Sequence, residues 1–104
     1  MPNESRVISF SNAEAIDALI DYCAAAKRDM PAGGIKRLVF SNDTEIKVTA
    51  DFNGGAPSIS FFQNEVAAAL IYYCNKKGIP VARRAVKSLQ VAQDTIALNL
   101  ALRS

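Results

Sequence analysis

Five cationic side chains gather in the stretch NKKGIPVARRAVK, which runs from Asn75 to Lys87. No acidic residue lies between Glu65 and Asp94, so the segment is locally positive. Clusters of Lys and Arg neutralise phosphates, and polar residues on a neighbouring strand can contact a nucleic-acid backbone. The stretch therefore predicts a polyanion-binding surface made of Lys76, Lys77, Arg83, Arg84 and Lys87. The alternative is a solvated basic loop, which the moderate pI of about 8.7 favours.

Residues suited to catalysis are few. The chain has no histidine, which removes the commonest general base and the commonest metal ligand. Asp17 and Asp21 lie one helical turn apart, but their place on a predicted outer face favours solvated carboxylates over an acid–base pair. Cys23 and Cys74 lie on predicted core stripes, where a thiol is structural rather than nucleophilic. We therefore expect no catalytic residue, no metal site and no cofactor.

The two cysteines belong to a repeated segment. ALIDYC spans residues 18–23 and ALIYYC spans residues 69–74, 51 positions later. Aligning residues 8–44 with residues 59–95 at this offset yields thirteen identities in thirty-seven pairs, whereas ordinary composition yields about one in fifteen. The chain is therefore interpreted as two copies of one unit.

The first copy is predicted to fold as strand, helix, strand, strand. ISF at residues 8–10 has the alternation of a half-buried strand, and Ser11 with Glu14 has the spacing of a capping box that begins a helix. Two strands with alternating hydrophobic residues follow around residues 38–40 and over residues 46–52. The core stripe of the helix recurs at helical spacing: Ile16, Leu19, Ile20 and Cys23.

The second copy predicts the same elements, with a helix over residues 64–77 and final strands near residues 86–92 and 96–102. At the offset of 51 the last strands of the two copies fall out of phase. An offset of 50 aligns Ile46 with Ile96 and keeps the hydrophobic residues of both strands on one face. The hairpin turn is expected to absorb this one-residue difference.

These elements predict a single α+β domain over residues 1–104, built of two pseudo-symmetric repeats at about 6–52 and 57–102. Each half is too small for a core of its own, so the copies should share one. The Asn-Gly turn signal in residues 53–57 should place the strands on either side of it next to each other. We expect a two-layer sandwich of one largely antiparallel sheet with both helices on one face. The opposite face would carry Ser9, Arg37, Ser41, Lys47, Thr49, Ser60, Ser88, Gln90 and Asn99.

Composition points to an ordinary globular protein. Half of the residues are hydrophobic, enough for one core. No apolar run is long enough to cross a bilayer and the N-terminal residues lack a signal-peptide pattern, so a cytoplasmic location is expected. Charge is uneven: residues 1–56 hold six basic and eight acidic residues, a net charge of −2, and residues 57–104 hold six and two, a net charge of +4.

The second helix differs from the first on its outer face. Asp17 and Asp21 of the first copy correspond to Ala68 and Tyr72 of the second. A helix face that loses charge and gains an aromatic residue has the composition of an interface core. We therefore predict an interface at Glu65, Ala68, Ala69, Tyr72 and Lys76, covered by a second copy in a homodimer or by another protein. The alternative is that Ala68 and Tyr72 pack under a loop of the same chain.

These observations favour a small non-enzymatic interaction module that self-associates or docks a protein partner. A nucleic-acid-binding protein that uses the basic stretch is the alternative. An enzyme or ligand-binding protein is third, because it would require Tyr22, Tyr73 and carboxylates to converge in a pocket between the two copies.

Overall fold

The computed structural model describes residues 4–83, 85–92 and 95–102. The described residues form two α-helices, six strands and one short 3₁₀ turn: β1 (Glu4–Ser11), α1 (Asn12–Ala25), β2 (Ile35–Asn42), β3 (Ile46–Phe52), η1 (Asn53–Gly55), β4 (Ile59–Phe62), α2 (Gln63–Lys77), β5 (Val86–Val91) and β6 (Thr95–Leu102). The α+β class is confirmed. The order strand, helix, strand, strand occurs twice along the chain. Within the described residues, no helix is both long enough and apolar enough to cross a membrane.

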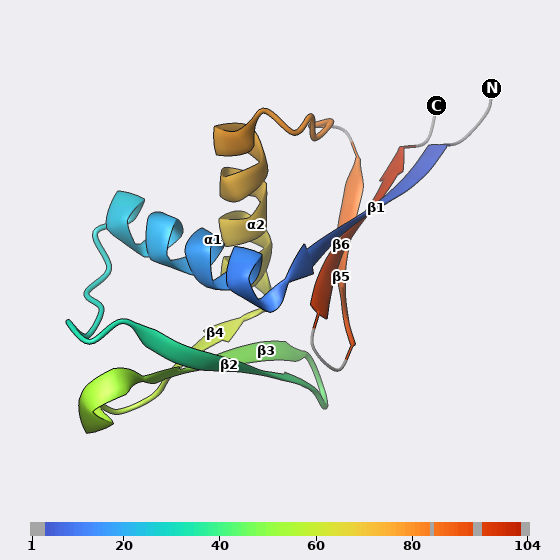
Figure 1. Ribbon diagram of the computed structural model, residues 1–104. Coiled ribbons are helices and arrows are strands. Elements are labelled where there is room, and N and C mark those ends of the chain that lie inside the picture. The colour runs from blue at the N-terminus through green and yellow to red at the C-terminus, as the bar shows by residue number, and fades with distance from the viewer. Residues whose placement is uncertain (1–3, 84, 93–94, 103–104) are drawn as a thin grey trace.

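The strands form two antiparallel sheets rather than the one sheet that the sequence predicted. β6 lies between β1 and β5, and β3 lies between β2 and β4 (Figure 1). The first strand of each half thus pairs with the last strand of the other half. In each case the added strand pairs with the free edge of the other half's hairpin, so the described strands form two separate three-stranded sheets. Between the sheets, β5 approaches β2 and β3 without backbone pairing.

The connection at residues 53–57 does place β3 beside β4, as predicted. The two strands pair antiparallel from Lys47 with Phe62 to Ala50 with Ile59. The connection is longer than a two-residue turn, because the η1 turn and three further residues separate the strands. Gly54 and Gly55 both have positive φ there, a conformation that glycine adopts without steric cost.

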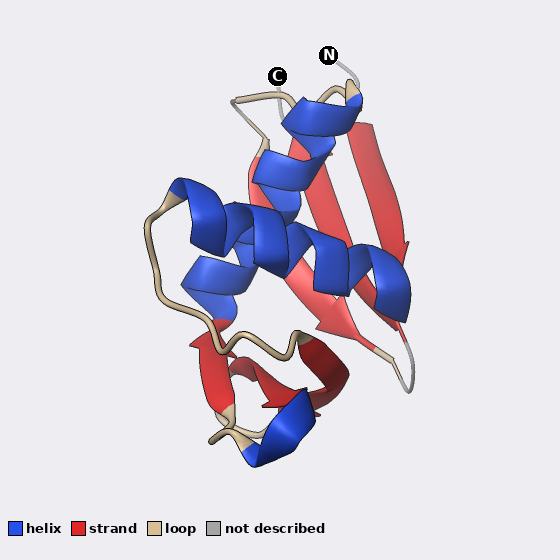
Figure 2. Ribbon diagram, turned by 60° about the vertical axis from the view of Figure 1, so that its left-hand side comes forward, coloured by secondary structure: helices blue, strands red, loops and turns tan. Residues whose placement is uncertain are grey.

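Both helices lie together in the angle between the sheets, where α1 crosses α2 (Figure 2). α1 contacts β1 and β6 of one sheet and β2 of the other, and α2 contacts β3, β4 and β5. The shared core that the sequence predicted therefore draws on both halves. Its most deeply buried large side chains are Phe10, Val48, Phe61, Leu70, Cys74, Ile96 and Leu98.

Strand pairing relates the two halves by constant offsets. Leu38 pairs with Ala50 and Leu89 pairs with Leu98. Ile8 pairs with Leu98, as Ile59 pairs with Ala50. The first and second strands thus correspond at an offset of 51 and the third strands at 48, rather than at the predicted 50. The predicted and observed offsets differ by two residues, and side chains two residues apart on a strand point to the same face. The prediction therefore placed the side chains on the correct faces but in the wrong rows.

The core stripe of α1 is shifted from the predicted one. Leu19 and Cys23 are buried as expected, together with Ala15 and Ala18. Ile20, however, is 39 % exposed. Because α1 packs against α2 as well as against the sheets, small alanines allow the close approach and the branched side chain lies at the margin.

Matched turns end the two helices. Lys27 N–H donates to the Ala24 carbonyl at 3.3 Å and Arg28 N–H to the Cys23 carbonyl at 2.8 Å. After α2, Gly78 and Ile79 repeat both bonds at the same distances, 3.3 and 2.8 Å. The left-handed residue is Gly78 (φ 75°) in α2 but Lys27 (φ 56°) in α1. A side chain in this conformation is strained by about 1–2 kcal/mol.

Lys27→Gly is therefore expected to raise the free energy of unfolding by about 0.5–1 kcal/mol, because relief of strain exceeds the added flexibility of the unfolded chain. Urea denaturation measures the change. The reverse substitution, Gly78→Lys, is the matched control and should lower the free energy of unfolding by a similar amount. Equal stability of Lys27→Gly and the wild type would show that this turn is unstrained.

Candidate functional site

The two cysteines and Tyr73 are used for packing. Cys23 and Cys74 are 2 % and 0 % exposed, and burial raises the pKa of both thiols. The Tyr73 ring packs edge-on against Phe10, with ring centroids 6.0 Å apart. Burial likewise raises the pKa of the Tyr73 hydroxyl. A thiol that stays protonated is a poor nucleophile, and the Tyr73 side chain is only 7 % exposed.

A cavity between the two halves is apolar and very small. Its volume is about 10 Å³, room for one water at most. The lining residues come from both helices and from strands of both sheets: Ala15, Leu19, Phe40, Val48, Val66, Ala69, Leu70 and Ile96. This cavity has no polar group that could hold a substrate or a cofactor. It is a packing defect of the shared core.

Three of the five basic residues have partners within the chain. Lys76 Nζ lies 3.0 Å from Asp21 Oδ2, and this bond raises the pKa of Lys76. Lys77 Nζ lies 5.6 Å from the centroid of the Tyr73 ring. Lys87 Nζ donates to the carbonyls of Arg83 and Ala85 at 3.2 and 3.0 Å.

Of the remaining basic residues, Arg83 is exposed, and Arg84 lies outside the described residues. Several of these cations thus have partners within the chain. Polyanion binding by the stretch stays a prediction.

The predicted interface of α2 turns out to lie largely against α1. Ala69 is fully buried. Glu65 accepts a hydrogen bond from Arg28, which follows α1 and whose guanidinium also lies 4.5 Å from the centroid of the Phe61 ring. Lys76 pairs with Asp21 of α1, as described above. Three of the five predicted residues thus have partners inside the chain, while Ala68 is half-buried and Tyr72 is 40 % exposed.

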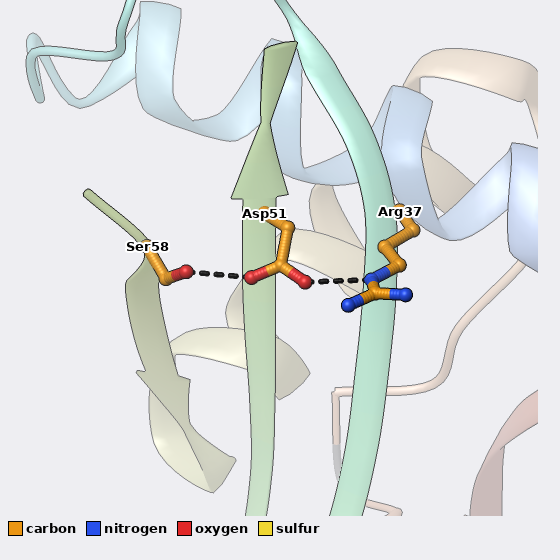
Figure 3. Close-up of polar contacts among 3 residues, drawn as sticks. All are labelled: Arg37, Asp51 and Ser58. Carbon is orange, nitrogen blue, oxygen red and sulfur yellow. Dashed lines mark hydrogen bonds and ion pairs between the residues drawn. The ribbon is translucent and has the colours of Figure 1, made fainter. Parts of the chain in front are cut away.

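The outer face of the β2–β3–β4 sheet carries the ion pair of Arg37 and Asp51. Asp51 accepts hydrogen bonds from Arg37 Nε at 2.7 Å and from Ser58 Oγ at 2.5 Å (Figure 3). These bonds, first that of Ser58 and then that of Arg37, lower the pKa of Asp51. We call this surface the charged face; it comprises Arg37, Val39, Ser41, Lys47, Thr49, Asp51, Ser58, Ser60 and Phe62. It is the usual arrangement for a sheet face in contact with water.

The outer face of the β1–β6–β5 sheet is different. We call it the neutral face; it comprises Ser5, Val7, Ser9, Val86, Ser88, Gln90, Ala97, Asn99 and Ala101. None of these nine residues carries a charge. Val7 is 61 % exposed and Val86 is 63 % exposed. A surface of this kind stands out on a chain in which 21 % of residues are charged.

Strand pairing shows which charges the neutral face lacks. Asn99 pairs with Val7 on one side and with Ser88 on the other. At the offsets given above, this row corresponds to Ser58, Asp51 and Arg37 of the charged face. Asp51 has two hydrogen-bond donors, whereas Asn99 Oδ1 is buried without a hydrogen-bond partner among the described residues.

Sequence reasoning placed Asn99, Ser88, Gln90 and Ser9 outside the core, and the structure confirms that placement. It missed the neutral face as a unit, because the offset of 50 matched Asp51 with Ala101 rather than with Asn99. Val7 and Val86 were also missed. Both valines alternate with inward-facing residues, Val7 along β1 and Val86 along β5, and this alternation could have identified them as outward-facing.

Comparison with known proteins adds no assignment to these surfaces. The two outer sheet faces differ in charge, several basic residues are hydrogen-bonded within the chain, and the cysteines are buried. No protein-family model, no curated protein and no solved structure matches this chain.

Proposed function

We propose that this chain is a non-enzymatic protein-interaction module whose binding surface is the neutral face. The observation that carries the proposal is a difference between the two sheet faces: the neutral face has the row Val7–Asn99–Ser88 where the charged face has the row Ser58–Asp51–Arg37. A sheet face open to water usually alternates polar residues outward. Interface cores, by contrast, are depleted of charge and tolerate exposed aliphatic residues that a partner covers.

Energetic considerations agree with this role. Val7 and Val86 each present more than half of their surface to water, and covering them contributes about 1 kcal/mol each. A carbonyl oxygen buried without a hydrogen bond costs about 1–3 kcal/mol. Rotation of the Asn99 side chain toward a partner that donates a hydrogen bond would recover part of that cost. A partner on this face therefore gains from both its apolar and its polar groups.

Other functions have less support. The cysteines and Tyr73 are buried, which weighs against nucleophilic or acid–base chemistry. Lys76 and Lys87 already have partners within the chain. A nucleic-acid-binding surface normally presents its cations free to meet phosphates. Binding at the neutral face would not require any of these lysines to leave its partner within the chain.

Site-specific photo-crosslinking in the cells that naturally make the protein tests the proposal. A benzophenone amino acid replaces Gln90 on the neutral face or, as the matched control, Val39 on the charged face; these positions correspond at the offset of 51. We expect cross-linked protein products from position 90 at several times the yield from position 39. Equal yields from both faces, or no protein product from position 90 either in the cells or with the purified protein at about 1 mM, would contradict the proposal.

A further inference from the structure

We propose that the partner of the neutral face is a second copy of this chain, related by a twofold axis that runs along β6. This inference rests on the proposed function and names the occupant of that surface. Because the nine residues carry no charge, two copies can face each other without like-charge repulsion. On the charged face, the equivalent axis along β3 would instead bring Lys47 and Asp51 against their own copies.

The surface shape of the neutral face is self-complementary about such an axis. An axis along β6 exchanges the edge strands, so β1 of one copy lies over β5 of the other. Val7 shares a row with Ser88, and Val86 shares a row with Ser5. Each valine of one copy therefore faces a serine of the other. In the two outer rows the central strand presents Ala97 and Ala101, whose small side chains leave room for close contact.

Asn99 occupies the centre of this arrangement. It lies in the middle row of the face, on the middle strand, so the axis brings it opposite its own copy. An isologous contact pairs a residue with itself in this way. A side-chain amide has both a donor and an acceptor, so two asparagines can bond reciprocally. That bond would give Asn99 Oδ1 the partner that it lacks among the described residues.

The size of the face limits the affinity. Three strands of about six residues cover roughly 20 Å by 14 Å. This area is well below the roughly 800 Å² that each partner buries in a standard interface. We therefore expect a weak dimer, with Kd on the order of 100 μM. The dimer would be present only at high local concentration.

Charge substitution at the axis provides the test. Asn99→Asp and Asn99→Lys each place like charges opposite one another, so each variant alone should show Kd raised at least about tenfold by sedimentation equilibrium. An equimolar mixture of the two variants should recover a dimer at least as tight as the wild type. Val39→Asp on the charged face is the control and should leave dimerisation unchanged. Circular dichroism verifies that each variant is folded.

Three results would overturn the inference: a wild type that stays monomeric up to about 1 mM, variants that dimerise as well as the wild type, or a mixture that does not recover. A monomeric wild type together with heterologous cross-links from position 90 would refute the second copy and retain the interaction surface. No protein cross-link from position 90 would refute the proposed function itself.

Discussion

Residues 1–56 and residues 57–104, prepared as two separate peptides, are each expected to be unfolded in water and to fold when mixed. β1 pairs with β6, and β4 pairs with β3, so a cut between the halves removes one strand from each sheet. α1 also loses its main packing partner, α2. A peptide of about 50 residues that keeps one helix and one hairpin cannot bury enough apolar surface to offset its chain entropy.

Far-ultraviolet circular dichroism of each peptide and of the equimolar mixture measures this effect. We expect weak, non-cooperative signals from the single peptides and a cooperative thermal transition from the mixture. A circular permutant that begins at residue 57 and joins the former termini by a short linker is the control for the cut itself. The ends of β1 and β6 lie side by side, as Figure 1 shows, so this permutant should fold. Cooperative, concentration-independent unfolding of either single peptide would contradict the expectation.

Phe61→Ala is expected to lower the free energy of unfolding by about 4 kcal/mol, which approaches the whole stability of many small domains. The Phe61 side chain is fully buried at the junction of β4 and α2. The Arg28 guanidinium lies 4.5 Å from the centroid of its ring, so the substitution also removes a cation–π contact. Close packing of the core limits how far the surrounding side chains can move into the cavity left behind.

Phe62→Ala is the matched control for this substitution. Phe62 is the next residue along the chain and is 48 % exposed on the charged face. Its removal should change the free energy of unfolding by less than about 1 kcal/mol. Urea denaturation at equilibrium measures both variants. A loss below about 1 kcal/mol for Phe61→Ala would show that the core is less tightly packed than the burial of this ring indicates.

Local sequence patterns were sufficient to predict the elements. The capping box of Ser11 and Glu14 was predicted, and both of its hydrogen bonds are present, at 3.2 and 2.9 Å. Alternation placed Ile46, Val48, Ala50 and Phe52 on the buried face of β3. These features depend on residues within a few positions of each other, so the sequence carries them directly.

Tertiary contacts decided the rest. The choice of β6 as the partner of β1 depends on residues about ninety positions apart, and no local pattern distinguishes that pairing from one continuous sheet. Glu65 pairs with Arg28, and Lys76 pairs with Asp21. Both pairs depend on the crossing of α1 over α2, which is a tertiary contact.

The neutral face likewise depends on register. Asn99 corresponds to Asp51 only at the offset that strand pairing sets. The sequence by itself thus determined the order of the elements and the buried side of each strand, because side-chain periodicity is local. The pairing of the strands, and with it the surface left without charge, is non-local and was decided only by the tertiary structure.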